Sequence, residues 1–278
     1  MSWKEFLVFV DGSEDGIARL RLAMAIADEH QGNLEALVLA PVPLNYAVAG
    51  EVLSAIESET RITLRAECEA TVAALREVAG KAANVHIHAW DIPSSDSQAA
   101  AARASRSADL VIFGRPEEMD GSRLDTDIFV GATTEGGRPC LMFPRWINPH
   151  PWGRRAVISW KGTPEAARAV QAALPFLKKA EAVRLCVANP QGEHVGEDEA
   201  GIARVHNYLR RHGVRVEEPV VRESWEGPDR MIVSEVEGFN ADFLVFGAYE
   251  GPRWADELWG GVTARMIKDA QIPVLMAH

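Results

Sequence analysis

The sequence contains one pattern of apolar segments twice. Three pairs of segments match in the same order: ADLVIFG at 108–114 with ADFLVFG at 241–247, PCLM at 139–142 with PVLM at 273–276, and FLVFVDGS at 6–13 with AVISWKGT at 156–163. The paired segments lie 133, 134 and 150 residues apart. Because the order is kept while the spacing drifts, we interpret the halves as duplicated domains that carry different insertions.

The joint between the halves is predicted at 145–154, where RWINPHPWGR combines two prolines and a glycine that interrupt any regular element. A chain of 278 residues is also long enough for two domains of ordinary size. We therefore expect one domain at 1–144 and a second, similar domain at 155–278.

Within each half, short apolar runs alternate with segments of helical periodicity. A continuous apolar run such as Phe6–Val10 is typical of a strand buried on both faces of a parallel sheet. Ser13 is expected to cap the helix that follows, and Thr163-Pro164 is a second helix start, with proline at the first helical position. The pattern predicts an α/β fold with a doubly wound parallel sheet in each half.

The expected strands are Phe6–Val10, Leu34–Leu39, Val85–Ala89, Leu110–Phe113, Cys140–Phe143, Ala156–Ser159, Val183–Val187, Val214–Val216, Phe243–Phe246 and Val274–Met276. Beyond the helix that Ser13 begins, helices are expected at 53–78, 97–105, 164–177, 200–211, 231–238 and 256–270.

Composition and charge exclude several classes of function. The chain has 29 Lys and Arg against 40 Asp and Glu, a net charge of −11, which repels the phosphate backbone of nucleic acids. The three scattered cysteines fit buried thiols in a reducing compartment. No leader or apolar stretch long enough to cross a membrane is evident, so we expect a cytoplasmic protein without a membrane partner.

The opening FLVFVDGSEDGIARLRLAMAIA, the second-half opening WKGTPEAARAVQAALPFL and the closing GAYEGPRWADELWGGVTARMIKDAQIPVLMAH resemble the universal stress protein family in its tandem form. The resemblance covers nearly the whole chain. It implies two five-stranded parallel sheets of strand order 3-2-1-4-5, an architecture like that of the adenine nucleotide alpha-hydrolases. It also implies self-association, either as a homodimer or by pairing of the two domains within one chain, and in many members ATP binding.

The family's phosphate loop, Gly-x2-Gly-x9-Gly-Ser/Thr, follows the fourth strand, where glycines let backbone N–H groups approach phosphates. The matching candidates in the second half are Gly247, Gly260, Gly261, Val262 and Thr263. Glu250 stands at the second glycine, and Lys161 replaces the aspartate that contacts the nucleoside in ATP-binding members. Both departures weaken the predicted site.

The first half offers a weaker version of the same site. It keeps Asp11 in the opening turn, with Gly114 and Gly131 as the candidate glycines, but Glu117 stands at the second glycine. Gly131 lies 17 residues after Gly114, against 13 residues between the corresponding glycines of the second half. The intervening segment is acidic, which disfavours a triphosphate.

No catalytic constellation stands out in the sequence, and we predict no enzyme activity. His86 and His88 are two residues apart on one strand, but no third ligand is near them in sequence, so no metal site is predicted. Two functions stay open: a stress-response module that binds an adenine nucleotide such as ATP in its second domain, and an interaction module with degenerate loops that binds none.

Overall fold

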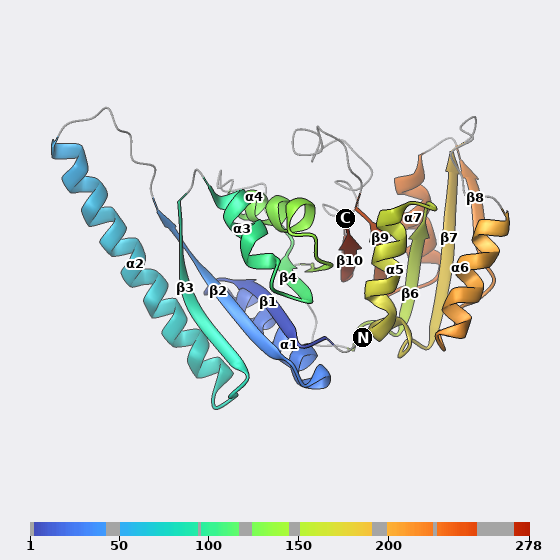
Figure 1. Ribbon diagram of the computed structural model, residues 1–278, viewed down its shortest axis with the longest axis horizontal. Helices are drawn as coiled ribbons and strands as arrows, with labels where there is room; N and C mark the ends of the chain where they lie inside the picture. The colour runs from blue at the N-terminus through green and yellow to red at the C-terminus, as the bar shows by residue number, and fades with distance from the viewer. Residues whose placement is uncertain are drawn as a thin grey trace. The chain divides into compact units, whose positions relative to one another are not determined.

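The computed structural model describes residues 3–42, 51–93, 96–116, 124–144, 151–190, 199–224, 227–248 and 270–278. The chain divides into two compact units, Met1–Arg138 with Arg145–Ile147 and Pro139–Pro144 with Asn148–His278. In each unit helices pack against a mostly parallel sheet (Figure 1). The predicted α/β class is confirmed.

The first unit is built on four parallel strands in the order β3-β2-β1-β4. They are β1 (Glu5–Val10), β2 (Asn33–Val42), β3 (Val85–Pro93) and β4 (Leu110–Gly114). Its helices are α1 (Glu14–His30), α2 (Glu51–Ala79), α3 (Ser97–Ser105) and α4 (Leu124–Val130), which continues into a π-helical turn at Gly131–Glu135. Positions 6–10 of β1 are all buried, as expected for a strand covered on both faces.

The second unit has strands in the order β5-β10-β9-β6-β7-β8, and every neighbouring pair is parallel except β5 with β10. The strands are β5 (Cys140–Phe143), β6 (Arg155–Trp160), β7 (Ala182–Pro190), β8 (Val220–Ser224), β9 (Phe243–Gly247) and β10 (Val274–Ala277). Its described helices are α5 (Pro164–Leu177), α6 (Glu199–Arg211) and α7 (Pro228–Gly238). The strands of the second half alone run in the order 3-2-1-4-5.

The strand β5 ends the first half of the sequence but groups with the second unit. It pairs antiparallel with β10, with Leu141 opposite Leu275. An open edge of β10 would expose unpaired backbone groups, and β5 covers it from within the chain. The domain limits at 144 and 155 rest on the duplication and stay a prediction.

The two expected helix caps are present. The Ser13 side chain accepts a hydrogen bond from the Gly16 N–H at the start of α1, and Thr163 accepts one from the Ala166 N–H at the start of α5, with Pro164 at the first helical position. Each cap satisfies a backbone donor that lacks a partner inside the helix.

One predicted strand is wrong. At Val214–Val216 the chain makes only an isolated bridge, between Val216 and Val183, and the edge strand β8 begins four residues later at Val220. Pro219 separates the two segments and has no N–H to donate to a ladder, so regular pairing with β7 starts only after it. The helix expected at 256–270 lies outside the described residues except for its last position.

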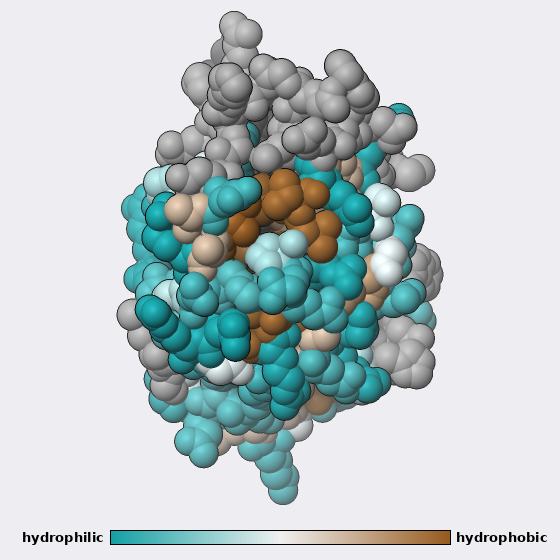
Figure 2. Space-filling view, turned by 90° about the vertical axis from the view of Figure 1, so that its right-hand side faces the viewer, coloured by the Kyte–Doolittle hydropathy of each residue, from teal (hydrophilic) through white to brown (hydrophobic). Residues whose placement is uncertain are grey.

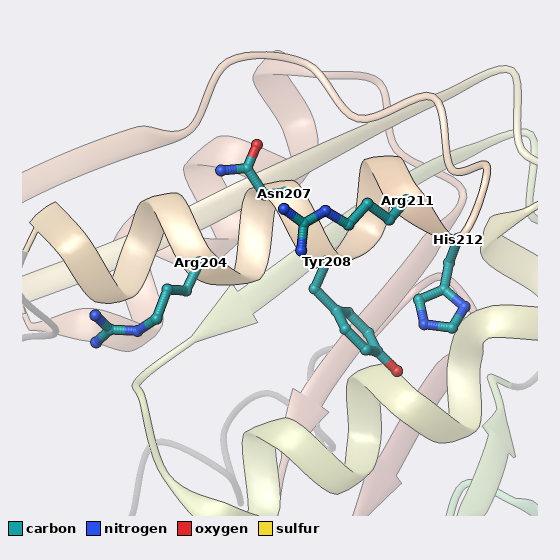
Figure 3. Close-up of a pocket in the computed structure, with 5 residues that line it drawn as sticks. All are labelled: Arg204, Asn207, Tyr208, Arg211 and His212. Atoms are coloured by element: carbon teal, nitrogen blue, oxygen red, sulfur yellow. The ribbon is translucent and has the colours of Figure 1, made fainter.

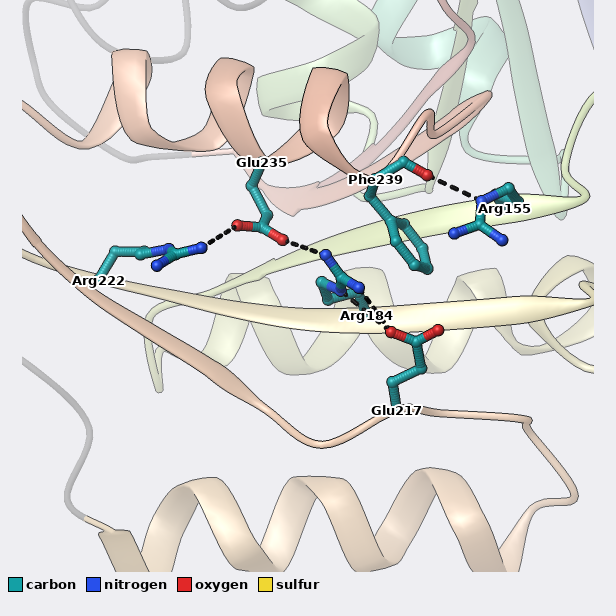
Figure 4. Close-up of polar contacts among 6 residues, drawn as sticks. All are labelled: Arg155, Arg184, Glu217, Arg222, Glu235 and Phe239. Carbon is teal, nitrogen blue, oxygen red and sulfur yellow. Dashed lines mark hydrogen bonds and ion pairs between the residues drawn. The ribbon is translucent and has the colours of Figure 1, made fainter.

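An ion-pair network fastens α7 to the sheet of the second unit (Figure 4). The buried carboxylate of Glu235 contacts Arg184 Nη1 at 2.7 Å and Arg222 Nη2 at 3.4 Å. Arg184 also contacts Glu217 Oε2 at 2.7 Å, and its guanidinium lies 4.0 Å from the centre of the Phe239 ring. Such a network holds α7 in one position, because the buried charges are costly to leave unpaired.

The surface beside β8 is mixed in character. Figure 2 shows a face that is mainly hydrophilic, with brown hydrophobic residues in several places among the hydrophilic ones. Val221 of β8 and Val233 of α7 are exposed at 48% and 40%. Among the described helices, none is both long enough and apolar enough to cross a membrane.

Candidate functional site

In the first unit, the carboxyl end of β1 leads into a tight turn that holds Asp11. The Asp11 Oδ1 atom accepts hydrogen bonds from the Ser13 N–H at 2.8 Å and from the Ser13 hydroxyl. A Cβ atom on Gly16 would lie 2.3 Å from the same oxygen. Glycine at position 16 is therefore what lets the carboxylate fold back against the start of α1.

Arg19 occupies the space between the carboxyl ends of β1 and β4. Its Nε donates to the Phe9 carbonyl at 2.8 Å, and its Nη2 lies 3.3 Å from Asp11 Oδ2. The Arg19 side chain is only 11% exposed. A Cβ atom on Gly114, at the end of β4, would lie 2.0 Å from Arg19 Nη1. The structure thus brings the predicted residues Asp11 and Gly114 together, but around an arginine of the chain itself.

The sequence analysis assigned no role to Arg19. A signal was present, because Gly16, Leu20, Ala23 and Ile26 form the buried side of α1 and position 19 lies three residues after Gly16 on that side. An arginine at an inward helical position needs a partner for its charge, and Asp11, in the turn that leads into the helix, is one of the carboxylates that precede it.

The charge of Arg19 affects Asp11 directly. Burial by itself raises the pKa of Asp11, but the hydrogen bonds from Ser13 and the charge of Arg19 outweigh it and hold the pKa below its ordinary value. The carboxylate is therefore ionised at neutral pH, and its negative charge disfavours a phosphate at this position.

Gly131 lies inside the helical run that follows α4 and is buried. A Cβ atom there would lie 2.0 Å from the Gln98 carbonyl oxygen of α3. The close approach of two helices accounts for this glycine without a phosphate. The nearest atoms to a Cβ at Gly131 all belong to Gln98, not to the turn that contains Asp11.

In the second unit, the turn after β6 is built differently. Lys161 is exposed where the first half has Asp11, and Gly162 follows with φ +70°, a conformation that favours glycine. In α5, Ala166 and the buried Ala169 stand where α1 has Gly16 and Arg19. A turn like that of Asp11 would clash with a methyl group at 166, so lysine in place of aspartate and alanine in place of glycine are linked changes.

Gly247 ends β9 directly against the start of α5. A Cβ atom on it would lie 2.4 Å from the Ala166 nitrogen and 2.7 Å from the Glu165 carbonyl carbon. The glycine is thus needed for the first turn of α5 to pack against the end of β9. Its predicted partners Gly260, Gly261, Val262 and Thr263 lie outside the described residues, as do Glu117 and Glu250.

A buried donor stands beside this turn. Trp160, the last residue of β6, has an indole Nε1 atom that is buried and has no hydrogen-bond partner among the described atoms. Buried polar groups in folded proteins are nearly always paired, and leaving one unpaired costs about 1–3 kcal/mol. Sequence reasoning had no signal for this donor, because tryptophan at a strand end is usually a core residue.

Within the described part of the chain, no group of three or more His, Cys, Asp or Glu side chains is placed to hold a metal ion. His86 and His88 lie on β3 opposite Glu35 and Leu37 of β2.

The structure is similar to solved structures of universal stress proteins. A universal stress protein from Archaeoglobus fulgidus matches with a TM-score of 0.67 and 13% identity, over 98% of this chain and 96% of that one. A functionally unknown protein from Pseudomonas aeruginosa PAO1 matches with a TM-score of 0.58 and 17% identity, over 99% and 92% of the two chains. A protein from Pseudomonas aeruginosa UCBPP-PA14, provisionally assigned to the universal stress proteins, gives the same values.

No protein-family model matches the sequence, and no curated protein matches it. The structural matches extend over both halves, so the chain has the fold of universal stress proteins. The resemblance expected from its motifs is confirmed at the level of the fold.

Proposed function

We propose that the chain is a stress-response module of the universal stress type that binds an adenine nucleotide in its second unit, at the carboxyl ends of β6 and β9. Ligands of doubly wound sheets bind where the strand order reverses. In the second unit β6 pairs with β7 on one side and with β9 on the other, so the reversal lies between β6 and β9.

The observation that carries this proposal is a cation placed at a helix start at that reversal. Lys161 follows β6 and lies two residues before Thr163, the cap of α5. Helix N-termini attract phosphate, and the exposed lysine, although it gives up the nucleoside contact that an aspartate would make, adds a positive charge for the phosphates. Gly247 keeps the helix start close to the strand ends.

The corresponding crevice of the first unit is less suited to a nucleotide. It contains the Arg19 side chain, which is paired with Asp11 and lies against Gly114, so the space for a phosphate is occupied by the chain itself. We therefore expect one nucleotide per chain, and we assign the module no catalytic step.

The proposal is tested by titration calorimetry of the full chain with ATP. Lys161→Gln should weaken binding about tenfold, because it removes one positive charge near the phosphates. Lys178→Gln is the matched control: it removes the same charge at the opposite end of α5, where Lys178 is the exposed C-cap residue, and should leave the affinity unchanged. Absence of binding at millimolar ATP, or an equal loss in both variants, would reject the nucleotide site.

One observation favours the alternative function, an interaction module without a nucleotide. The antiparallel pair of β5 and β10 joins the last strands of the two halves within one chain. If ATP does not bind, the pairing of β5 with β10 would be the feature on which the interaction module is built. The intrachain pair predicts a monomer of 30.4 kDa by analytical ultracentrifugation, whereas a homodimer would require a different edge.

A further inference from the structure

The outward side of α6 carries a row of polar and aromatic side chains. Its inward side consists of Gly201, Ile202, Val205, His206 and Leu209. Outward positions recur at helical spacing, and together with the residue after the helix they line a surface cavity of about 360 Å³ (Figure 3). The lining residues are Arg204, Asn207, Tyr208, Arg211 and His212. This volume falls within the range of about 300–1,000 Å³ that small-molecule sites occupy.

Two aromatic rings form one part of the cavity. The Tyr208 and His212 ring centres lie 4.3 Å apart with an angle of 53° between the planes. In Figure 3 both rings project to the same side of α6, while the Arg211 side chain extends back along the helix toward Asn207. A ligand in the cavity can therefore contact the face of an aromatic ring as well as a guanidinium.

Arginines line the cavity of a protein whose net charge is negative. Two of its five lining residues are arginines and none is acidic, although the chain as a whole carries a net charge of −11. The guanidinium group of arginine matches the geometry of phosphate and carboxylate, and the amide of Asn207 adds a donor beside it. Aromatic rings contribute by stacking on planar groups.

We propose that this cavity binds a small organic anion, with a phosphate group held by Arg211 and Asn207 and a flat ring packed against Tyr208. The site shares no residue with the nucleotide site proposed at β6 and β9. We expect its ligands to be phosphate monoesters of planar alcohols, in which Arg211 and Asn207 bind the phosphate while the Tyr208 ring packs against the planar group.

The test uses fluorine NMR of the full chain labelled with 3-fluorotyrosine. The chain has three tyrosines, so its spectrum has three signals, and Tyr208→Phe identifies the signal of Tyr208 by its loss. Phenyl phosphate should shift that signal and saturate with a dissociation constant of about 1 mM or below. Inorganic phosphate alone and phenol alone should each bind about tenfold more weakly, because each offers one recognition element.

Two neighbouring arginines give a matched pair of variants. Arg211→Gln should weaken phenyl phosphate binding about tenfold, because it removes the charged donor from the cavity. Arg210→Gln removes the same charge from an exposed position that does not line the cavity, and should change the affinity less than twofold. Lys161→Gln should have no effect, which separates this site from the proposed nucleotide site. A Tyr208 signal that does not saturate by about 10 mM, or equal losses in the two arginine variants, overturns the proposal.

Discussion

Removing either partner of the Arg184–Glu235 ion pair should destabilise the second unit, but by unequal amounts. Glu235 is 5% exposed, and without Arg184 its carboxylate retains, among the described residues, the ion pair with Arg222 at 3.4 Å. Arg184 is 24% exposed, and without Glu235 it keeps Glu217 at 2.7 Å and the Phe239 ring. Unpairing one partner of a buried ion pair costs about 3–5 kcal/mol when no other partner is left.

From these contacts we expect Arg184→Gln to lower the free energy of unfolding by about 3 kcal/mol and Glu235→Gln by about 1–2 kcal/mol. Arg154→Gln is the control, because Arg154 and its partner Glu181 are 60% and 54% exposed and such a pair contributes at most about 1 kcal/mol.

The measurement is urea unfolding, combined with hydrogen exchange of β6 and β7 amides so that the second unit is followed by itself. Three variants measured at one pH give the order directly: Arg184→Gln largest, Glu235→Gln intermediate, Arg154→Gln smallest. Equal costs for the two buried partners, or a larger cost for Glu235→Gln, would refute the idea that residual partners set the energies.

Three further predictions concern the first unit and the cysteines. Because the pKa of Asp11 is lowered in the fold, its carboxylate adds stability above about pH 4 that is lost as the pH falls through the folded pKa, and Asp11→Asn should flatten this acid-side decline in a pH series of urea midpoints. Gly131→Ala should destabilise the chain by about 1–3 kcal/mol in thermal unfolding, since its Cβ would lie 2.0 Å from the Gln98 carbonyl oxygen, and an unchanged midpoint would contradict this packing. The thiols of Cys68, Cys140 and Cys186 should react with a thiol reagent at pH 8 only after unfolding. All three are buried, and burial also raises the pKa of Cys140 and of Cys186.

Much of the fold could be predicted from local sequence because strands buried on both faces must be continuously apolar. This is why runs such as Phe6–Val10 and Phe243–Phe246 located β1 and β9 within a residue or so. The caps at Ser13 and Thr163 were equally readable, because a hydroxyl before a helix satisfies a backbone donor locally. The same reasoning failed for β8, where the segment Val214–Val216 before Pro219 looked like the strand.

The candidate site was less readable, because its residues meet only in three dimensions. Gly114 and Gly131 have the same identity in the sequence, yet one makes room for Arg19 and the other for the Gln98 carbonyl. A glycine pattern cannot distinguish close backbone packing from phosphate binding, since both require the absence of a Cβ atom.

The amino-acid sequence by itself predicted the α/β class, most of the strand positions and the turn that holds Asp11, because each depends on burial or capping within a few neighbouring residues. Only the tertiary structure decided that Arg19 fills the crevice of the first unit, that β5 pairs with β10, and that a cationic cavity lies on α6. These features depend on how side chains meet in three dimensions, and periodicity gives the side of a helix on which a residue lies but not what that residue contacts.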